Sequence, residues 1–164
     1  MLKRYVIGIL LVLLIAGGFF AVVRHAARNA PVLCEVCSRP VHEGMGYHLV
    51  VAGASKTACC ARCGMHFQLL RPGEVRAAFA RDFYSGSEIP AENAFYVEGG
   101  NEEYCAHVQP VERKEIQGTA ELAYDRCTPP LVAFAKVTDA EKYRAEHGGR
   151  LLAYAEALES VRRR

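Results

Sequence analysis

The cysteine spacing constrains this chain more than any other feature of its sequence. Five of the seven cysteines lie within about thirty residues, as Cys34-x2-Cys37 followed by Cys59-Cys60-x2-Cys63. Two thiolate pairs about twenty residues apart can close a tetrahedron around one soft or borderline metal ion. We therefore interpret both pairs as metal ligands, and we expect a zinc or copper ion because thiolates suit both.

The identity of the third thiolate is open. Cys60-x2-Cys63 repeats the spacing of the first pair, whereas Cys59 lies one residue back, on the opposite face of an extended chain. Two histidines, His42 and His66, lie within a few residues of the cysteine pairs and could replace a thiolate. A histidine beside a metal site more often hydrogen-bonds to a ligand or lies at the surface, so we expect the thiolates to dominate.

Disulfide bonds and redox chemistry are the alternatives to metal. Seven cysteines are an odd number, so the thiols cannot all pair within the chain. A redox dithiol would need its Cys-x2-Cys between a strand and a long helix, and that pattern is missing around Cys34. No Ser-His-Asp set or catalytic carboxylate pair can be picked out, which favours a binding protein over an enzyme. The formal net charge of +2 gives no indication of nucleic-acid binding.

The amino terminus predicts a membrane anchor over residues 1–28. Residues 5–23 form an uncharged, mostly aliphatic run that would span the roughly 30 Å hydrocarbon core as a helix. Because only Lys3, Arg4 and two other residues precede this run, we expect a single-pass protein in contact with the bilayer, with an extracytoplasmic (periplasmic) carboxy-terminal domain. A cleaved signal peptide is the alternative, although no A-x-A-like cleavage site follows.

Strand and helix signals predict a compact metal-binding unit over residues 33–71. Residues 46–52 and 56–60 have the pattern of a hairpin with a short turn between the strands. Residues 64–70 predict a short helix, which puts Cys63 at its amino terminus, where the helix dipole would lower the pKa of the thiol. Knuckle, hairpin and helix would bring four sulfurs together, as in treble-clef zinc folds.

The remainder predicts an α+β unit over residues 72–158 and a basic tail over residues 159–164. Its expected elements are strands over 94–98 and 131–136, a helix over 138–147, a strand over 150–154 and a helix from about residue 155. A capping box from Thr138 to Glu141 supports the first of these helices.

Two segments resemble known families. The stretch CEVCSRPVHEGMGYHLVVAGASKTACCARCGMHF resembles the cysteine-rich metal-binding domains called TRASH-like, in which two cysteine pairs flank a hairpin and an aromatic such as Phe67 follows. The run YDRCTPPLVAFAKVTDAEKYRAEHGGRLLAYAEAL is similar to the carboxy-terminal half of the NosL family, accessory proteins of nitrous-oxide reductase that bind and deliver copper. The resemblance covers about residues 33–158 and implies two ββαβ-type units.

The chain also departs from the NosL pattern. NosL proteins are usually lipoproteins with a methionine-bearing copper site, whereas this chain has a thiol-rich site and only Met45 and Met65 beyond the initiator. Delivery to nitrous-oxide reductase is therefore not carried over. We predict a membrane-tethered protein that handles copper or zinc and passes it to an acceptor protein. The alternative is a structural zinc-binding interaction module without metal transfer.

Cys105 and Cys127 lie apart from the other cysteines in the sequence. Two such thiols outside the cytoplasm usually pair, so we predict a disulfide between them. The alternative is a second metal site, to which His107 would add a nitrogen because it lies on the same side of an extended chain as Cys105.

Overall fold

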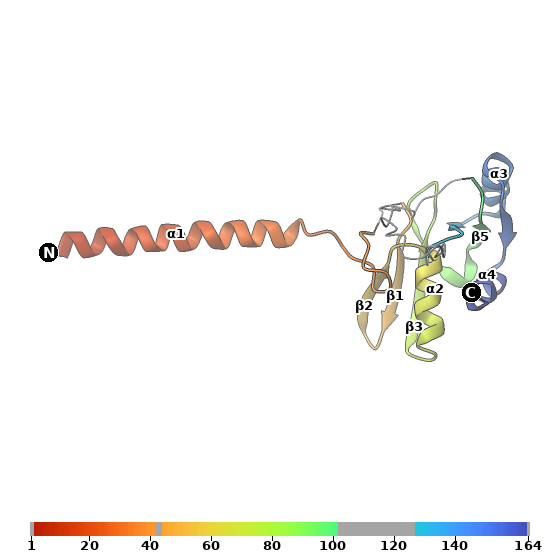
Figure 1. The fold of residues 1–164 in the computed structure, drawn as a ribbon, viewed down its shortest axis with the longest axis horizontal. Coiled ribbons are helices and arrows are strands. Elements are labelled where there is room, and N and C mark those ends of the chain that lie inside the picture. Colours follow the sequence, from red (N-terminus) through yellow and green to blue (C-terminus); the bar gives the residue numbers. More distant parts are fainter. Residues whose placement is uncertain (1, 42–43, 102–126, 164) are drawn as a thin grey trace, which may run out of the picture. The chain divides into compact units, whose positions relative to one another are not determined.

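The structure, a computed structural model, describes residues 2–41, 44–101 and 127–163. It has an α+β fold (Figure 1). The chain divides into two units, Met1–Pro31 and Val32–Arg164. The first unit contains helix α1 (Leu2–Arg28), and the described part of the second contains three more α-helices, a short 3-10 helix and two antiparallel sheets.

Helix α1 forms where the sequence predicts a helix, and it is 27 residues long. Among the described residues, however, no helix combines the length and the apolar content that a membrane crossing requires. The predicted transmembrane helix over residues 5–23 is therefore wrong. The extracytoplasmic location that we inferred from it stays an untested prediction.

Two successive ββαβ units build the region Val32–Arg164 (Figure 1). The first consists of β1 (Tyr47–Val51), β2 (Ala54–Ala58), α2 (Ala61–Leu70) and β3 (Val75–Arg81). The second consists of β5 (Phe95–Glu98), β6 (Leu131–Phe134), α3 (Val137–His147) and β7 (Arg150–Leu152). The sheet orders are β2-β1-β3-β4 and β6-β5-β7, so both units place their first strand between the second and the third. This is the repeat that the NosL resemblance implies.

Three further elements complete the fold. Strand β4 (Glu88–Pro90) extends the first sheet, the 3-10 helix η1 (Ala91–Asn93) follows it, and α4 (Tyr154–Arg162) closes the described chain. The sequence did not predict β3 or β4. Strand β3 is rich in alanine, which is depleted in strands. Strand β3 forms because it pairs with β1 along its length.

The β1–β2 hairpin positions the second cysteine cluster. Its two-residue turn is Ala52–Gly53, and both residues have positive φ (47° and 82°), as a type I′ turn requires. The turn therefore comes earlier than the sequence predicted, and β2 ends at Ala58. Consequently, Cys59 and Cys60 lie between the strand and helix α2 and not within the strand.

Helix α2 packs closely on β1. A Cβ atom at Gly64 would lie 2.0 Å from Cδ1 of the fully buried Tyr47, so only glycine allows this approach. The Tyr47 hydroxyl donates to Gln68 Oε1 (2.8 Å), and the Gln68 amide donates to the Tyr154 hydroxyl (3.1 Å). These contacts fix α2 between the first sheet and α4.

The buried carboxylate of Asp82 joins the two sheets. It accepts hydrogen bonds from the backbone N–H of Ala135 (2.7 Å), just beyond β6, and from the hydroxyl of Ser85 (2.6 Å). The next residue, Phe83, donates its N–H to Ala133 O (3.0 Å). The end of β3 is thereby tied to the end of β6.

Helix α3 confirms the predicted helix but not its predicted cap. It begins at Val137, after Lys136 as N-cap, and no side chain caps it. The expected capping box at Thr138 is therefore wrong by two residues. Gly148, with a φ of 77°, ends the helix after His147, where the predicted helix over residues 138–147 also ends.

Candidate metal centre

The first cysteine pair lies on a tight loop. The Cys34 N–H donates to Arg39 O (2.8 Å), and the Ser38 N–H donates back to Cys34 O (2.9 Å). Ser38 takes a positive φ of 58°, which reverses the chain within the loop. The Val36 N–H points at the Cys34 sulfur at 3.4 Å, a contact that stabilises negative charge on the sulfur. The loop is therefore built to hold a thiolate.

The second cluster lies where β2 ends and α2 begins. Cys60 is the N-cap residue of α2, with extended backbone angles (φ −156°, ψ 168°) and no side-chain capping bond. Cys63 lies in the first helical turn, as predicted, and Cys59, Cys60 and Cys63 are all at most 1% exposed. The strand-to-helix transition thus delivers three sulfurs to one buried place.

Four of the predicted ligands come together in a first thiol group, Cys34, Cys37, Cys59 and Cys63. Their sulfurs all lie within 4.8 Å of one another, and those of Cys37 and Cys59 are 3.5 Å apart. Four sulfurs at about 2.3 Å from one tetrahedral ion would be roughly 3.8 Å apart, so the observed spacing matches a ligand set. Of the two candidates for the third thiolate, the structure places Cys59 in this group.

A second thiol group, Cys59, Cys60, Cys63 and Cys127, overlaps the first. Its sulfurs also lie within 4.8 Å of one another. The Cys127 sulfur is 3.7 Å from that of Cys59 and 3.6 Å from that of Cys63, although 64 residues separate Cys127 from Cys63. All four residues are buried. Sequence reasoning set Cys127 apart from the cluster, whereas the structure makes it a member.

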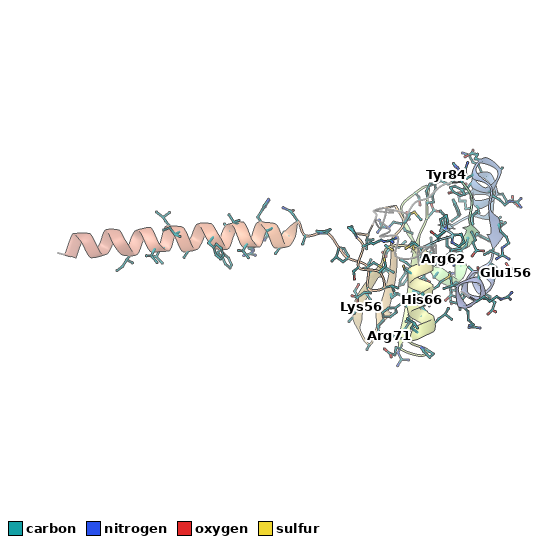
Figure 2. All side chains as sticks on the ribbon, in the orientation of Figure 1. Lys56, Arg62, His66, Arg71, Tyr84 and Glu156 are labelled. Atoms are coloured by element: carbon teal, nitrogen blue, oxygen red, sulfur yellow. The ribbon has the colours of Figure 1, made fainter. Side chains whose placement is uncertain are left out.

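The other predicted site residues lie elsewhere. His66 is partly buried on α2 and belongs to neither thiol group (Figure 2). His42, Cys105 and His107 lie outside the described residues, so the predicted disulfide between Cys105 and Cys127 is untested. The position of Cys127 among the cluster sulfurs favours the alternative, in which Cys127 is a metal ligand.

Sequence reasoning also missed Arg62, which joins the start of α2, where Cys60 and Cys63 lie, to the segment that carries Cys127. Arg62 lies in the first turn of α2, between the cysteines of the second pair (Figure 2). Its guanidinium donates from Nε to Pro129 O (2.6 Å), two residues after Cys127, and from Nη2 to Glu98 Oε1 (2.5 Å). The contact with Pro129 holds the segment that carries Cys127 against the start of α2. The sequence offered one signal, an arginine between two metal-ligand candidates.

The Arg62–Glu98 ion pair is buried, with the two residues 3% and 9% exposed. Burial alone would raise the pKa of Glu98. Hydrogen bonds from Ser160, Arg150 and Arg62 outweigh it and lower that pKa to about 2. Glu98 is therefore a carboxylate at neutral pH and can hold Arg62 in place.

The thiols influence one another's pKa values. Hydrogen bonds from the Cys59 and Cys63 thiols lower the pKa of Cys34 strongly. The pKa of Cys63 is raised, because it hydrogen-bonds with Cys127 and Cys34, so the predicted lowering by the helix dipole is wrong. Burial raises the pKa of Cys37. Negative charge in the first group therefore concentrates on Cys34, and a metal ion would be needed to stabilise several thiolates at once.

Comparisons with known proteins agree with this fold. No protein-family model matches the chain. The HTH-type transcriptional repressor CutR of Bacillus subtilis is 24% identical over 147 residues, a match that covers 89% of this chain and 66% of the repressor. The crystal structure of the copper chaperone NosL from Shewanella denitrificans matches with a TM-score of 0.53 and 19% identity, covering 76% of this chain and 87% of that one.

The chain therefore has a NosL-like fold that carries a cysteine-rich candidate metal site. The fold follows from the structural match, and the site follows from the sulfur positions. The chain spans just under two thirds of the repressor's length, so about a third of that protein has no counterpart here.

Proposed function

We propose that this protein binds copper(I) or zinc(II) through the first thiol group and passes the ion to an acceptor protein. The observation that carries the proposal is the convergence of the Cys34, Cys37, Cys59 and Cys63 sulfurs within 4.8 Å. Both ions prefer thiolate ligands. The role is metal binding and handling and not catalysis.

Exposure supports transfer. Cys34, Cys59 and Cys63 are 3%, 1% and 0% exposed, whereas Cys37 is only partly buried. An acceptor's ligand can approach an ion where one of its thiolates reaches solvent, and a closed site does not offer that route. Cys37 is therefore the ligand that would dissociate first during exchange.

Copper(I) is the cargo that we favour. A solved structure with this fold is that of a copper chaperone, and thiolates are among the ligands that copper(I) prefers. The sequence relative is a transcriptional repressor, so the two similar proteins have different roles. We infer that the two proteins share a domain with this chain but not a role. Neither of them therefore identifies the acceptor protein.

A structural zinc site is the second candidate. It is favoured by the burial of three of the four thiols, which is typical of ions that staple a fold. Such a site would release its ion only when the domain unfolds. The rate of exchange therefore separates the two functions.

Metal titration of the reduced full chain tests the proposal. The chain should bind Cu(I) and Zn(II), and a Cys34→Ser/Cys37→Ser variant should lose the ion of the first thiol group. A His66→Asn variant is the matched control and should bind as the wild type does. A competing thiol chelator should remove Cu(I) from the first thiol group without unfolding the chain, as monitored by circular dichroism. Failure to bind either ion, or equal binding by the double variant, would contradict the proposal.

A further inference from the structure

We propose that the cluster binds a second ion, held by Cys59, Cys60, Cys63 and Cys127, with the Cys59 and Cys63 thiolates bridging both ions. This inference rests on the proposed function, because it extends the same site. The first ion would keep Cys34 and Cys37 as its terminal ligands. The second would have Cys60 and Cys127.

The sulfur positions carry the inference. Cys59 and Cys63 belong to both four-sulfur groups, so six cysteines provide two complete tetrahedral ligand sets. Within the second group, the sulfur separations from Cys59 to Cys60, from Cys59 to Cys127 and from Cys63 to Cys127 are 3.9, 3.7 and 3.6 Å. The edge of a tetrahedron with metal–sulfur bonds of about 2.3 Å is roughly 3.8 Å. The second group thus fits an ion as well as the first does.

Shared thiolates set the distance between the ions. Two tetrahedra with bonds of about 2.3 Å that share one edge place their centres roughly 3 Å apart. Only a ligand that can donate to two ions at once allows such an approach, and thiolate sulfur has the lone pairs to do so. The occupants must therefore be soft or borderline ions such as Zn(II), Cd(II) or Cu(I).

Charge also favours a second ion. The Cys34, Cys59, Cys60, Cys63 and Cys127 side chains are all at most 3% exposed. If all six cysteines ionise around one divalent ion, the buried cluster keeps a large negative charge, and a second divalent ion removes half of it. Arg62, the only buried cationic side chain among the described residues, is already paired with Glu98.

The protein holds the second group in place before any ion binds. Cys60 is fixed as the N-cap of α2 and Cys63 lies in its first turn. Arg62, between them, donates to Pro129 O at 2.6 Å and so fixes the chain just beyond Cys127. A set of ligands prepositioned in this way loses little conformational entropy when it binds metal.

Native mass spectrometry of the reduced full chain with Zn(II) tests the stoichiometry. We expect two ions in the wild type and one in a Cys60→Ser/Cys127→Ser variant. We also expect one in a Cys34→Ser/Cys37→Ser variant, because each double variant removes the terminal ligands of one ion. A Cys105→Ser variant is the control that keeps all six cluster thiols, and it should bind two.

Cadmium NMR of the wild type tests the bridge without relying on variants that might not fold. The chain loaded with 113Cd(II) should give two resonances in the range of all-sulfur coordination, with scalar coupling between them through the shared thiolates. A single bound ion, two uncoupled resonances, or a Cys105–Cys127 disulfide in the two-ion form would overturn the second site and leave the proposed function intact. A chain that binds no metal would overturn both.

Discussion

The two thiol groups differ in how the chain brings their ligands together. The first takes Cys34 and Cys37 from a loop closed by its own hydrogen bonds, and one of its ligands reaches solvent. The second takes Cys127 from a distant segment, and all of its ligands are buried. Local bonds therefore make one half of the cluster, and the packing of the two ββαβ units makes the other.

This difference predicts different behaviour. An ion in the first thiol group should exchange, because Cys37 can leave it without disturbing the core. An ion in the second should be retained until the contact between α2 and the Cys127 segment opens.

Loss of the buried ion pair should have the largest effect. Glu98→Gln leaves the Arg62 guanidinium buried opposite a neutral amide, and breaking a buried pair costs about 3–5 kcal/mol. The free energy of unfolding, measured by urea denaturation of the metal-free chain, should fall by that amount. The control is Glu159→Gln on α4, whose ion pairs with Arg162 and Arg163 are exposed to solvent, so its loss should change the free energy of unfolding little. Similar losses in the two variants would contradict the role of Glu98.

Acid should weaken the same contact. The pKa of Glu98 is about 2 in the folded chain, against an ordinary value of 4.5. Because the folded pKa is the lower one, the stabilisation is complete above about pH 5 and is lost as the pH falls toward 2. The loss attributable to this group should reach up to about 3 kcal/mol. Denaturation curves from pH 6 to pH 2.5 should show a shallower decline for Glu98→Gln than for the wild type, and parallel declines would refute the assignment.

Substitution of Gly64 should disturb both groups, because they share Cys63. In Gly64→Ala the new Cβ would meet the ring of Tyr47 at 2.0 Å, which forces α2 away from β1. Overpacking of this kind costs about 1–3 kcal/mol, and thermal unfolding of the metal-free chain would measure it. Gly44→Ala is the control, since nothing lies within 4 Å of its Cβ. If Gly64→Ala proved as stable as Gly44→Ala, the close packing described for α2 would be wrong.

The smallest expected effect is on thiol reactivity. In the reduced, metal-free chain, Cys37 should be alkylated before the other described cysteines, because the others are at most 3% exposed and the reagent cannot reach them. We expect this access to outweigh the pKa values, which are raised for Cys37 and lowered for Cys34. Peptide mapping after brief iodoacetamide treatment measures the order. Earlier modification of Cys127 would show that solvent reaches the second thiol group. That result would contradict the difference in exposure between the two thiol groups.

The sequence predicted what is local. The hairpin, the position of Cys63 at the start of α2 and the helix ending at Gly148 all follow from short patterns of turn residues and apolar alternation. It did not predict strand β3, because that strand forms through its pairing with β1 and its alanine-rich sequence has little strand propensity. Nor could it predict Cys127 in the cluster, because a contact across 64 residues leaves no trace in spacing. Arg62 was missed for the same reason, since its partners Glu98 and Pro129 lie in the second half of the chain.

X-ray absorption spectroscopy of the metal-loaded full chain identifies the atoms bound to the ion, and so it decides whether the cysteine cluster holds the metal. With zinc, we expect a coordination shell of four sulfur atoms at about 2.3 Å and no nitrogen or oxygen. In Cys34→Ser/Cys37→Ser the ion of the first thiol group should be lost, and the remaining ion should keep four sulfur ligands. A shell dominated by nitrogen or oxygen at about 2.0 Å in the wild type would mean that the cysteine cluster does not hold the metal.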